Sequence, residues 1–100
     1  MDDTDILSMA GSIGFTCDLT DPDGYDLDEY SLEEVLKIDG VEFGVKMKLD
    51  LFAKTCSDVQ ISYKYRKKGA GKVMDALSKC MKAVDYDLMA FEAKGYTIKA

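Results

Sequence analysis

The 100-residue sequence contains no histidine and no tryptophan, a single proline and only three cysteines. Without histidine, the chain by itself cannot form a Ser-His-Asp triad, a Cys-His catalytic pair or a histidine-ligated metal site. No apolar run approaches the roughly 18 residues of a membrane-spanning helix, so we expect no membrane segment. The N-terminal MDDTD is acidic where a secretory signal is basic, which predicts a cytoplasmic protein.

The three cysteines are Cys17, Cys56 and Cys80. Their odd number and the lack of CxxC spacing argue against a disulfide framework and against a metal site. We interpret them as reduced, mostly buried thiols of a cytosolic protein. Cys80 is the candidate reactive thiol if it lies exposed beside Lys79 or Lys82, whose charge would lower the pKa of the thiol.

Charge is distributed unevenly along the chain. Residues 1–36 contain 11 acidic and no basic residues, and residues 37–100 contain all 13 basic residues and 8 acidic ones. Either the basic part neutralises the acidic part within the fold, or the acidic part binds a basic protein partner, as an inhibitor or nucleic-acid mimic would. The candidate partner-binding residues are Asp21, Asp23, Asp26, Asp28 and Glu29.

The length and the 47% apolar content predict one domain with one core. Apolar and polar residues alternate over 41–51 and again over 59–66, on either side of a polar stretch at 54–57 that we interpret as a loop. This period of two predicts an antiparallel β-hairpin over 41–66. An apolar stripe of period 3.6 then predicts a helix over 72–94.

The remaining elements are expected to be short. Residues 1–16 are interpreted as a short helix or an extended arm, and 96–99 as a final strand. The capping-box spacing of Ser31 and Glu34 predicts a helix over 32–38 that ends at Asp39-Gly40. Asp85-Tyr86-Asp87 are weak helix formers, so 88–92 could instead be a strand. The predicted class is α+β: a hairpin or small sheet packed against a long C-terminal helix, with a short helical, acidic N-terminal segment.

One segment could bind a phosphate. Tyr65 is followed by Arg66-Lys67-Lys68-Gly69-Ala70-Gly71-Lys72, which places a basic, glycine-containing turn between the predicted strand and the helix. Glycines let the backbone approach a phosphate closely, and the N–H groups of a helix N-terminus bind anions. Over residues 41–84 the sequence resembles the GNAT (Gcn5-related N-acetyltransferase) family, whose signature is a strand, R/Q-x-x-G-x-G/A and a helix.

The resemblance implies acetyl-CoA binding by residues 66–72 and acetyl transfer to an amine. It also implies a general base and a general acid, for which Glu42 and Tyr96 are the candidates. The family places a strand directly after this helix, splayed from the strand before it to admit the cofactor. The alternative interpretation of 66–71 is a strand-to-helix turn without a ligand.

Other functions have less support in the sequence. The basic cluster from Lys64 to Lys72 could contact phosphates, but the net charge of −6 argues against nucleic acid as the main partner. The Asp-rich stretch 18–29 does not have the ligand spacing of an EF-hand loop, so we expect no metal. If the strands cover only half of the apolar helix stripe, the rest of the stripe could form a homodimer.

Overall fold

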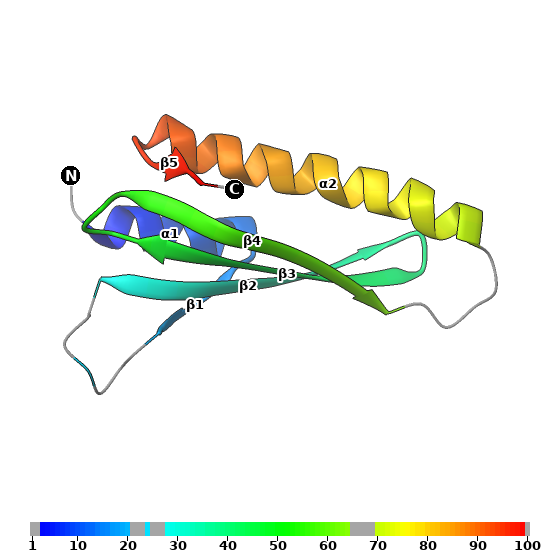
Figure 1. Cartoon of the computed structure of the whole chain (residues 1–100), viewed down its shortest axis with the longest axis horizontal. Coiled ribbons are helices and arrows are strands. Elements are labelled where there is room, and N and C mark those ends of the chain that lie inside the picture. Colours follow the sequence, from blue (N-terminus) through cyan, green and yellow to red (C-terminus); the bar gives the residue numbers. More distant parts are fainter. Residues whose placement is uncertain (1–2, 21–23, 25–27, 65–69, 100) are drawn as a thin grey trace.

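The computed structural model of the chain describes residues 3–20, 24, 28–64 and 70–99. The elements along the chain are α1 (Asp3–Ile13), β1 (Thr16–Leu19), β2 (Glu29–Ile38), β3 (Val41–Asp50), β4 (Thr55–Lys64), α2 (Ala70–Ala93) and β5 (Thr97–Ile98). The strands form one sheet in the order β1-β2-β3-β4-β5, antiparallel except for the parallel pair β4–β5. The α+β class is confirmed, and α2 runs along the length of the sheet (Figure 1).

The predicted helix over 32–38 is wrong, because these residues belong to β2. Along β2, Leu32 and Glu34 are buried while Glu33 and Val35 are exposed, which is the period of a strand. β2 pairs with β3 over ten residues, from Glu29 opposite Asp50 to Ile38 opposite Val41. Asp39 and Gly40, with φ of 51° and 81°, form the two-residue hairpin turn between them.

The hairpin of β3 and β4 is confirmed, but its turn lies earlier than expected. The turn occupies 51–54, where the Asp50 side chain accepts hydrogen bonds of 2.9 Å from the backbone N–H groups of Phe52 and Ala53. Strand β4 already begins at Thr55, so the predicted loop over 54–57 is wrong in most of its extent. The short Asx-type turn leaves the polar residues 55–57 free to pair with β3.

Strand β4 contains one extra residue relative to β3. Lys48 lies opposite Ser57, but Lys46 lies opposite Gln60, so β4 bulges at Asp58, whose φ is 53°. The bulge lets both Cys56 and Val59 face the core although they are three residues apart.

The long helix is continuous through residues 85–87, and 88–92 is helical rather than a strand. Burial of Val84 and Phe91 on the sheet side outweighs the weak propensity of the intervening residues. The helix ends where Tyr96 N–H donates to Phe91 O at 3.1 Å and Gly95 has a φ of 92°, as in a Schellman motif. The predicted final strand is present as β5.

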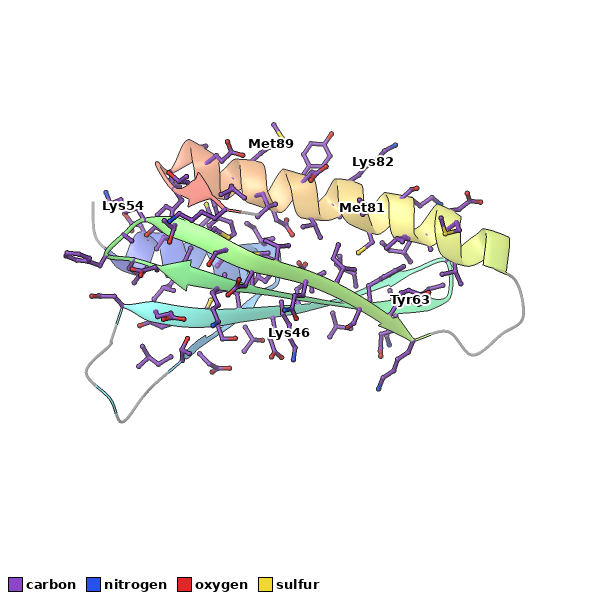
Figure 2. The ribbon with its side chains drawn as sticks, in the orientation of Figure 1. Lys46, Lys54, Tyr63, Met81, Lys82 and Met89 are labelled. Carbon is purple, nitrogen blue, oxygen red and sulfur yellow. The ribbon has the colours of Figure 1, made fainter. Side chains whose placement is uncertain are left out.

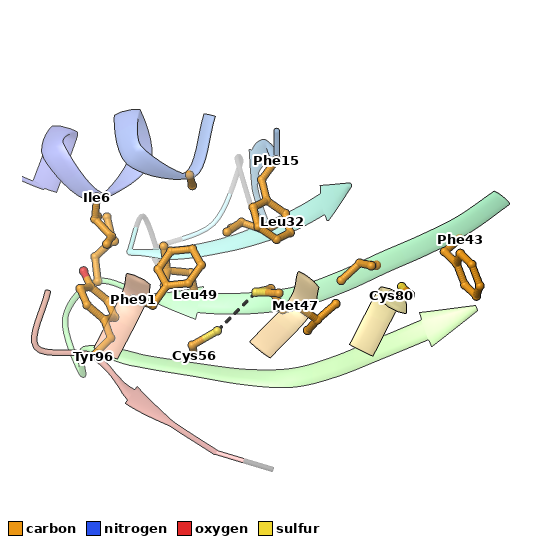
Figure 3. Close-up of a cluster of buried hydrophobic side chains, with 14 of the residues drawn as sticks. Ile6, Phe15, Leu32, Phe43, Met47, Leu49, Cys56, Cys80, Phe91 and Tyr96 are labelled. Atoms are coloured by element: carbon orange, nitrogen blue, oxygen red, sulfur yellow. Dashed lines mark hydrogen bonds between the residues drawn. The ribbon is translucent and has the colours of Figure 1, made fainter. Parts of the chain in front are cut away.

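A single core joins both helices to one face of the sheet (Figure 3). Ile6 and Ala10 of α1 are buried in it, and the ring of Phe15 lies 6.2 Å from that of Phe91 in α2. The inward residues of the central strand β3 are fully or almost fully buried: Val41, Phe43, Val45, Met47 and Leu49. The opposite face of the sheet bears the polar residues of the same strands.

Candidate functional site

The glycine-containing segment connects the carboxyl end of β4 to the first turn of α2. Arg66, Lys67, Lys68 and Gly69 lie outside the described residues, and Ala70, Gly71 and Lys72 are the first three residues of α2. The helix therefore begins within the segment that the sequence singled out. Backbone N–H groups of a first helical turn have no partner inside the helix and are available to an anion.

Strand β5 covers only the beginning of the neighbouring edge of β4. The parallel pairing joins Thr55 to Thr97 and Cys56 to Ile98, and Lys99 N–H donates to Cys56 O at 2.8 Å. Beyond Cys56, no strand in the described part of the chain pairs with this edge of β4. The backbone edge of β4 that faces away from β3 is therefore unpaired from Val59 to Lys64. Lys64 is the last residue of β4, and the glycine-containing segment follows it in the chain (Figure 1).

The candidate base Glu42 lies beside this end of β4. It is exposed and is the cross-strand partner of Lys64, the last residue of β4. Next to the two, the outer face of the sheet is hollowed at Gly44, where a Cβ would approach Ser62 Oγ to 3.1 Å. The shallow hollow is lined by Val35, Glu42, Phe43, Gly44, Ser62, Tyr63 and Lys64.

The candidate acid Tyr96 lies at the other end of the sheet. It is buried beside the start of β5, and its neighbour Thr97 donates a backbone hydrogen bond of 2.9 Å to Lys54 O (Figure 3). Glu42 is near the opposite end of β3, about 25 Å away along a strand of that length. The structure therefore does not bring Glu42 and Tyr96 together around one substrate.

The acidic candidates belong to the connection between β1 and β2. Asp21, Asp23 and Asp26 lie outside the described residues. Asp28 accepts a backbone hydrogen bond of 2.9 Å from Leu51 N–H through its carbonyl, and Glu29 lies 3.7 Å from Lys48.

A second ion pair joins Glu33 to Lys46 at 3.5 Å on the outer face of the sheet (Figure 2 labels Lys46). Part of the acidic segment is thus neutralised by lysines of β3. Lys64, at the end of β4, does not lie near Glu29. Lys64 is opposite Glu42 at one end of β3, whereas Glu29 is opposite Asp50 at the other end.

Sequence reasoning missed a buried pair of carboxyl groups. Glu34 of β2 is only 9% exposed, shares a hydrogen bond with Asp87 of α2, and has no partner for its second oxygen, Oε2. Burial raises the pKa of Glu34 to about 7, with the charge and hydrogen bond of Asp87 acting in the same direction. Burial also raises the pKa of Asp87. A strand interpretation of 29–38 would have placed Glu34 between Leu32 and Leu36 on the inward face.

The thiols are free but shielded. Cys56 and Cys80 are fully buried, and Cys17 is half-buried. The condition for a reactive Cys80 is not met: burial raises the pKa of its thiol, and the nearby Glu34 and Asp87 raise it further. Cys56 donates a hydrogen bond of 3.4 Å to the sulfur of Met47 within the core (Figure 3).

Within the described residues, no group of three or more cysteine or carboxylate side chains is arranged to hold a metal ion. Neither of the described helices has both the length and the apolar character that crossing a membrane demands. No protein-family model matches the chain, and comparisons with curated proteins and with solved structures found no match.

Proposed function

We propose that the chain binds acetyl-CoA, with its phosphates at residues 66–72 and its acyl arm directed along the free edge of β4. The observation that carries this proposal is the arrangement of β4, α2 and β5. Strands β4 and β5 run parallel and are connected by α2. They pair only where Thr55 and Cys56 lie opposite Thr97 and Ile98. Within the described residues the backbone edge of the rest of β4 is therefore unpaired, and it leads to the glycine-containing segment.

The chemistry of that segment suits a pyrophosphate. The N-terminus of a 24-residue helix carries a partial positive charge and unpaired N–H groups. Arg66, Lys67, Lys68 and Lys72 add charged donors in the same stretch of sequence. The acidic connection between β1 and β2 begins after Leu19 and ends before Glu29, at the end of the sheet opposite to Lys64 of β4.

The free edge of β4 suits the remainder of the cofactor. The arm that carries the thioester contains two amide groups, which can pair with backbone N–H and C=O groups as an added strand does. The half-buried Val59 and Ile61 supply apolar contacts along this edge. These features support binding more directly than catalysis, since Glu42 and Tyr96 lie apart.

The direct test is an NMR titration of the full chain with acetyl-CoA. Saturable shifts of the amides of residues 68–72 are expected, together with shifts along 59–64. Gly69→Glu should abolish binding, because it places a carboxylate in the phosphate cradle. Gly11→Glu is the matched control, since Gly11 is exposed in α1 and a Cβ added there would have open space around it. No shift at millimolar acetyl-CoA, or full binding by Gly69→Glu, would refute the proposal.

Acetyl transfer is a separate step with its own assay. The amine nitrogen attacks the thioester carbonyl and the C–S bond breaks. The proton that the base takes from the amine then passes to the departing sulfur, so that CoA leaves as the thiol. Glu42 is the candidate base beside this end of β4. If it acts, Glu42→Gln should lower the release of free CoA thiol with a small polyamine without changing acetyl-CoA affinity. An equal rate of release in both proteins would exclude this role.

The alternative function is a non-catalytic protein that binds a basic partner through its acidic connection. The observation that favours it is that the two strand ends flanking this connection, Leu19 and Glu29, lie at the end of the sheet opposite to Lys64 of β4. Changing Asp21, Asp23, Asp26 and Asp28 to Asn should weaken capture of a basic partner and reduce its salt dependence. Unchanged capture would count against this alternative.

A further inference from the structure

The side chains along the free edge of β4 match those of a second, antiparallel copy of the same edge. An unpaired strand edge presents N–H and C=O groups that readily pair with another strand. Over 58–64, exposed polar residues alternate with residues whose side chains face the core side of the sheet. The exposed set is Asp58, Gln60, Ser62 and Lys64, and the core-side set is Val59, Ile61 and Tyr63.

Two copies of this segment can pair as antiparallel strands with Ile61 at the centre of the paired region. In that register Ile61 faces Ile61 of the second copy, and Val59 faces Tyr63, so apolar side chains meet on the core side. On the outer side Gln60 faces Ser62. The charged residues Asp58 and Lys64 also face each other, and this attractive pair forms twice in a symmetric dimer.

Exposed apolar residues of α2 lie on the same side of the molecule. Asp87 contacts Glu34 of β2, so the opposite flank of α2 lies toward β4. This flank carries Met81, which is 53% exposed, and Figure 2 shows Met81 on the side of α2 toward β4 and Met89 on the outward side. Tyr63, 52% exposed at the end of β4, adds to the uncovered apolar surface.

We propose that a second copy of this chain pairs with the free edge of β4, antiparallel and centred on Ile61. The two sheets then form one continuous sheet, with both α2 helices on the same face. The bulge residue Asp58 and the terminal Lys64 are charges of the kind that keep a strand edge from pairing with other strands. Within one chain Asp58 lies 3.6 Å from Lys48, and Lys64 lies opposite Glu42. In this register each of the two also faces an opposite charge of the second copy, which favours pairing with the same chain over pairing with other strands.

The pairing does not depend on acetyl-CoA binding. If both proposals hold, the cofactor arm and the second copy compete for one edge, and acetyl-CoA should shift the chain toward the monomer. The dimer is therefore measured first without cofactor, so that its failure leaves the proposed function untouched.

The test is sedimentation equilibrium of the full chain with a charge-exchange pair. Lys64→Asp places two carboxylates opposite each other twice per dimer and should weaken dimerisation at least tenfold. Combining it with Asp58→Lys restores the opposite charges between the copies, with loss of the exposed intrachain ion pair to Lys48, and should recover most of the affinity. Lys82→Asp is the control with the same change of charge on the exposed surface of α2. Circular dichroism melts check that each variant is folded.

A second measurement does not depend on charge or on the folding of the Asp58 variant. Ile61→Cys should form an intermolecular disulfide on mild oxidation, since directly opposed residues of antiparallel strands have Cα atoms about 4.5–5.5 Å apart, within the range of a disulfide. Val35→Cys, exposed on the outer face of the sheet, should not. A monomer at all concentrations, or equal cross-linking of the two variants, would overturn the proposal. A dimer that Lys64→Asp leaves intact would also overturn it.

Discussion

The carboxyl groups of Glu34 and Asp87 share a hydrogen bond across the interface between β2 and α2. This polar contact holds α2 against β2 at Asp87, whereas the rest of the inward side of α2 packs through apolar side chains. The hydrogen bond also requires a proton on one of the two carboxyl groups, because two ionised carboxylates in contact repel each other in a buried environment. The stability of the fold is therefore linked to pH at this point.

The first prediction concerns that linkage. The pKa of Glu34 is raised from 4.5 to about 7, so the folded state binds the proton more tightly than the unfolded state. The stabilisation is complete below pH 4.5 and is lost as the pH rises through 7. The full shift corresponds to about 3 kcal/mol in the free energy of unfolding, which solvent screening of this partly exposed pair reduces to about 2 kcal/mol. Urea unfolding at pH 4.5–8 measures it.

Glu34→Gln should remove most of this pH dependence, since the amide is neutral and still forms hydrogen bonds. The variant should be more stable than the parent at pH 8. Glu33→Gln is the control, because Glu33 is exposed on the other face of the sheet. An unchanged slope in Glu34→Gln would show that the carboxyl pair does not carry the linkage.

The second prediction compares two glycines of the N-terminal region. Gly14 has a φ of 123°, and a Cβ there would lie 3.1 Å from Oε1 of Glu34. Gly14→Ala should therefore destabilise the fold by about 1–3 kcal/mol. Gly11 lies inside α1 with open space around it, so Gly11→Ala should instead stabilise by about 0.5–1 kcal/mol. Thermal melts that fail to give opposite signs would contradict this comparison.

The third prediction separates the two sides of α2. Phe91 is fully buried and contacts Phe15, so Phe91→Ala should cost about 3–5 kcal/mol. Met89 lies two residues away, is 60% exposed, and points away from the sheet (Figure 2), so Met89→Ala should change stability by less than about 0.5 kcal/mol. The midpoints of denaturant unfolding measure both effects. Equal losses of stability in the two variants would mean that α2 is rotated relative to the sheet.

The fourth prediction concerns thiol reactivity. Burial raises the pKa of all three thiols, and only Cys17 is partly accessible. In the native protein at pH 7.5, iodoacetamide should modify Cys17 slowly, and Cys56 and Cys80 only through unfolding. Mass spectrometry of digests after a time course identifies the labelled sites. Rapid labelling of Cys80 would show that α2 opens at its contact with Glu34.

Local sequence pattern determined the elements whose period is unambiguous. Alternation over 41–51 predicted the inward face of β3, and the 3.6-residue stripe predicted a helix over 72–94, because both patterns report burial on one side of an element. The sequence left 88–92 open between helix and strand, and the structure shows one helix from Ala70 to Ala93. The segment 32–38 was misassigned because Ser31 and Glu34 have the spacing of a helix cap. The alternation of buried and exposed residues in this segment and the turn-forming pair Asp39-Gly40 instead favour the hairpin of β2 and β3 that the structure shows.

The sequence by itself also determined the composition of the possible sites: no histidine, an acidic first third and a basic, glycine-containing turn. Tertiary structure alone decided which residues meet. It placed Glu42 and Tyr96 at opposite ends of the sheet, brought Glu34 and Asp87 together across 53 positions of chain, and left the edge of β4 free beyond Cys56. Such contacts depend on how the sheet and helices pack, and the pattern of one segment carries no information about the segment that will pack against it.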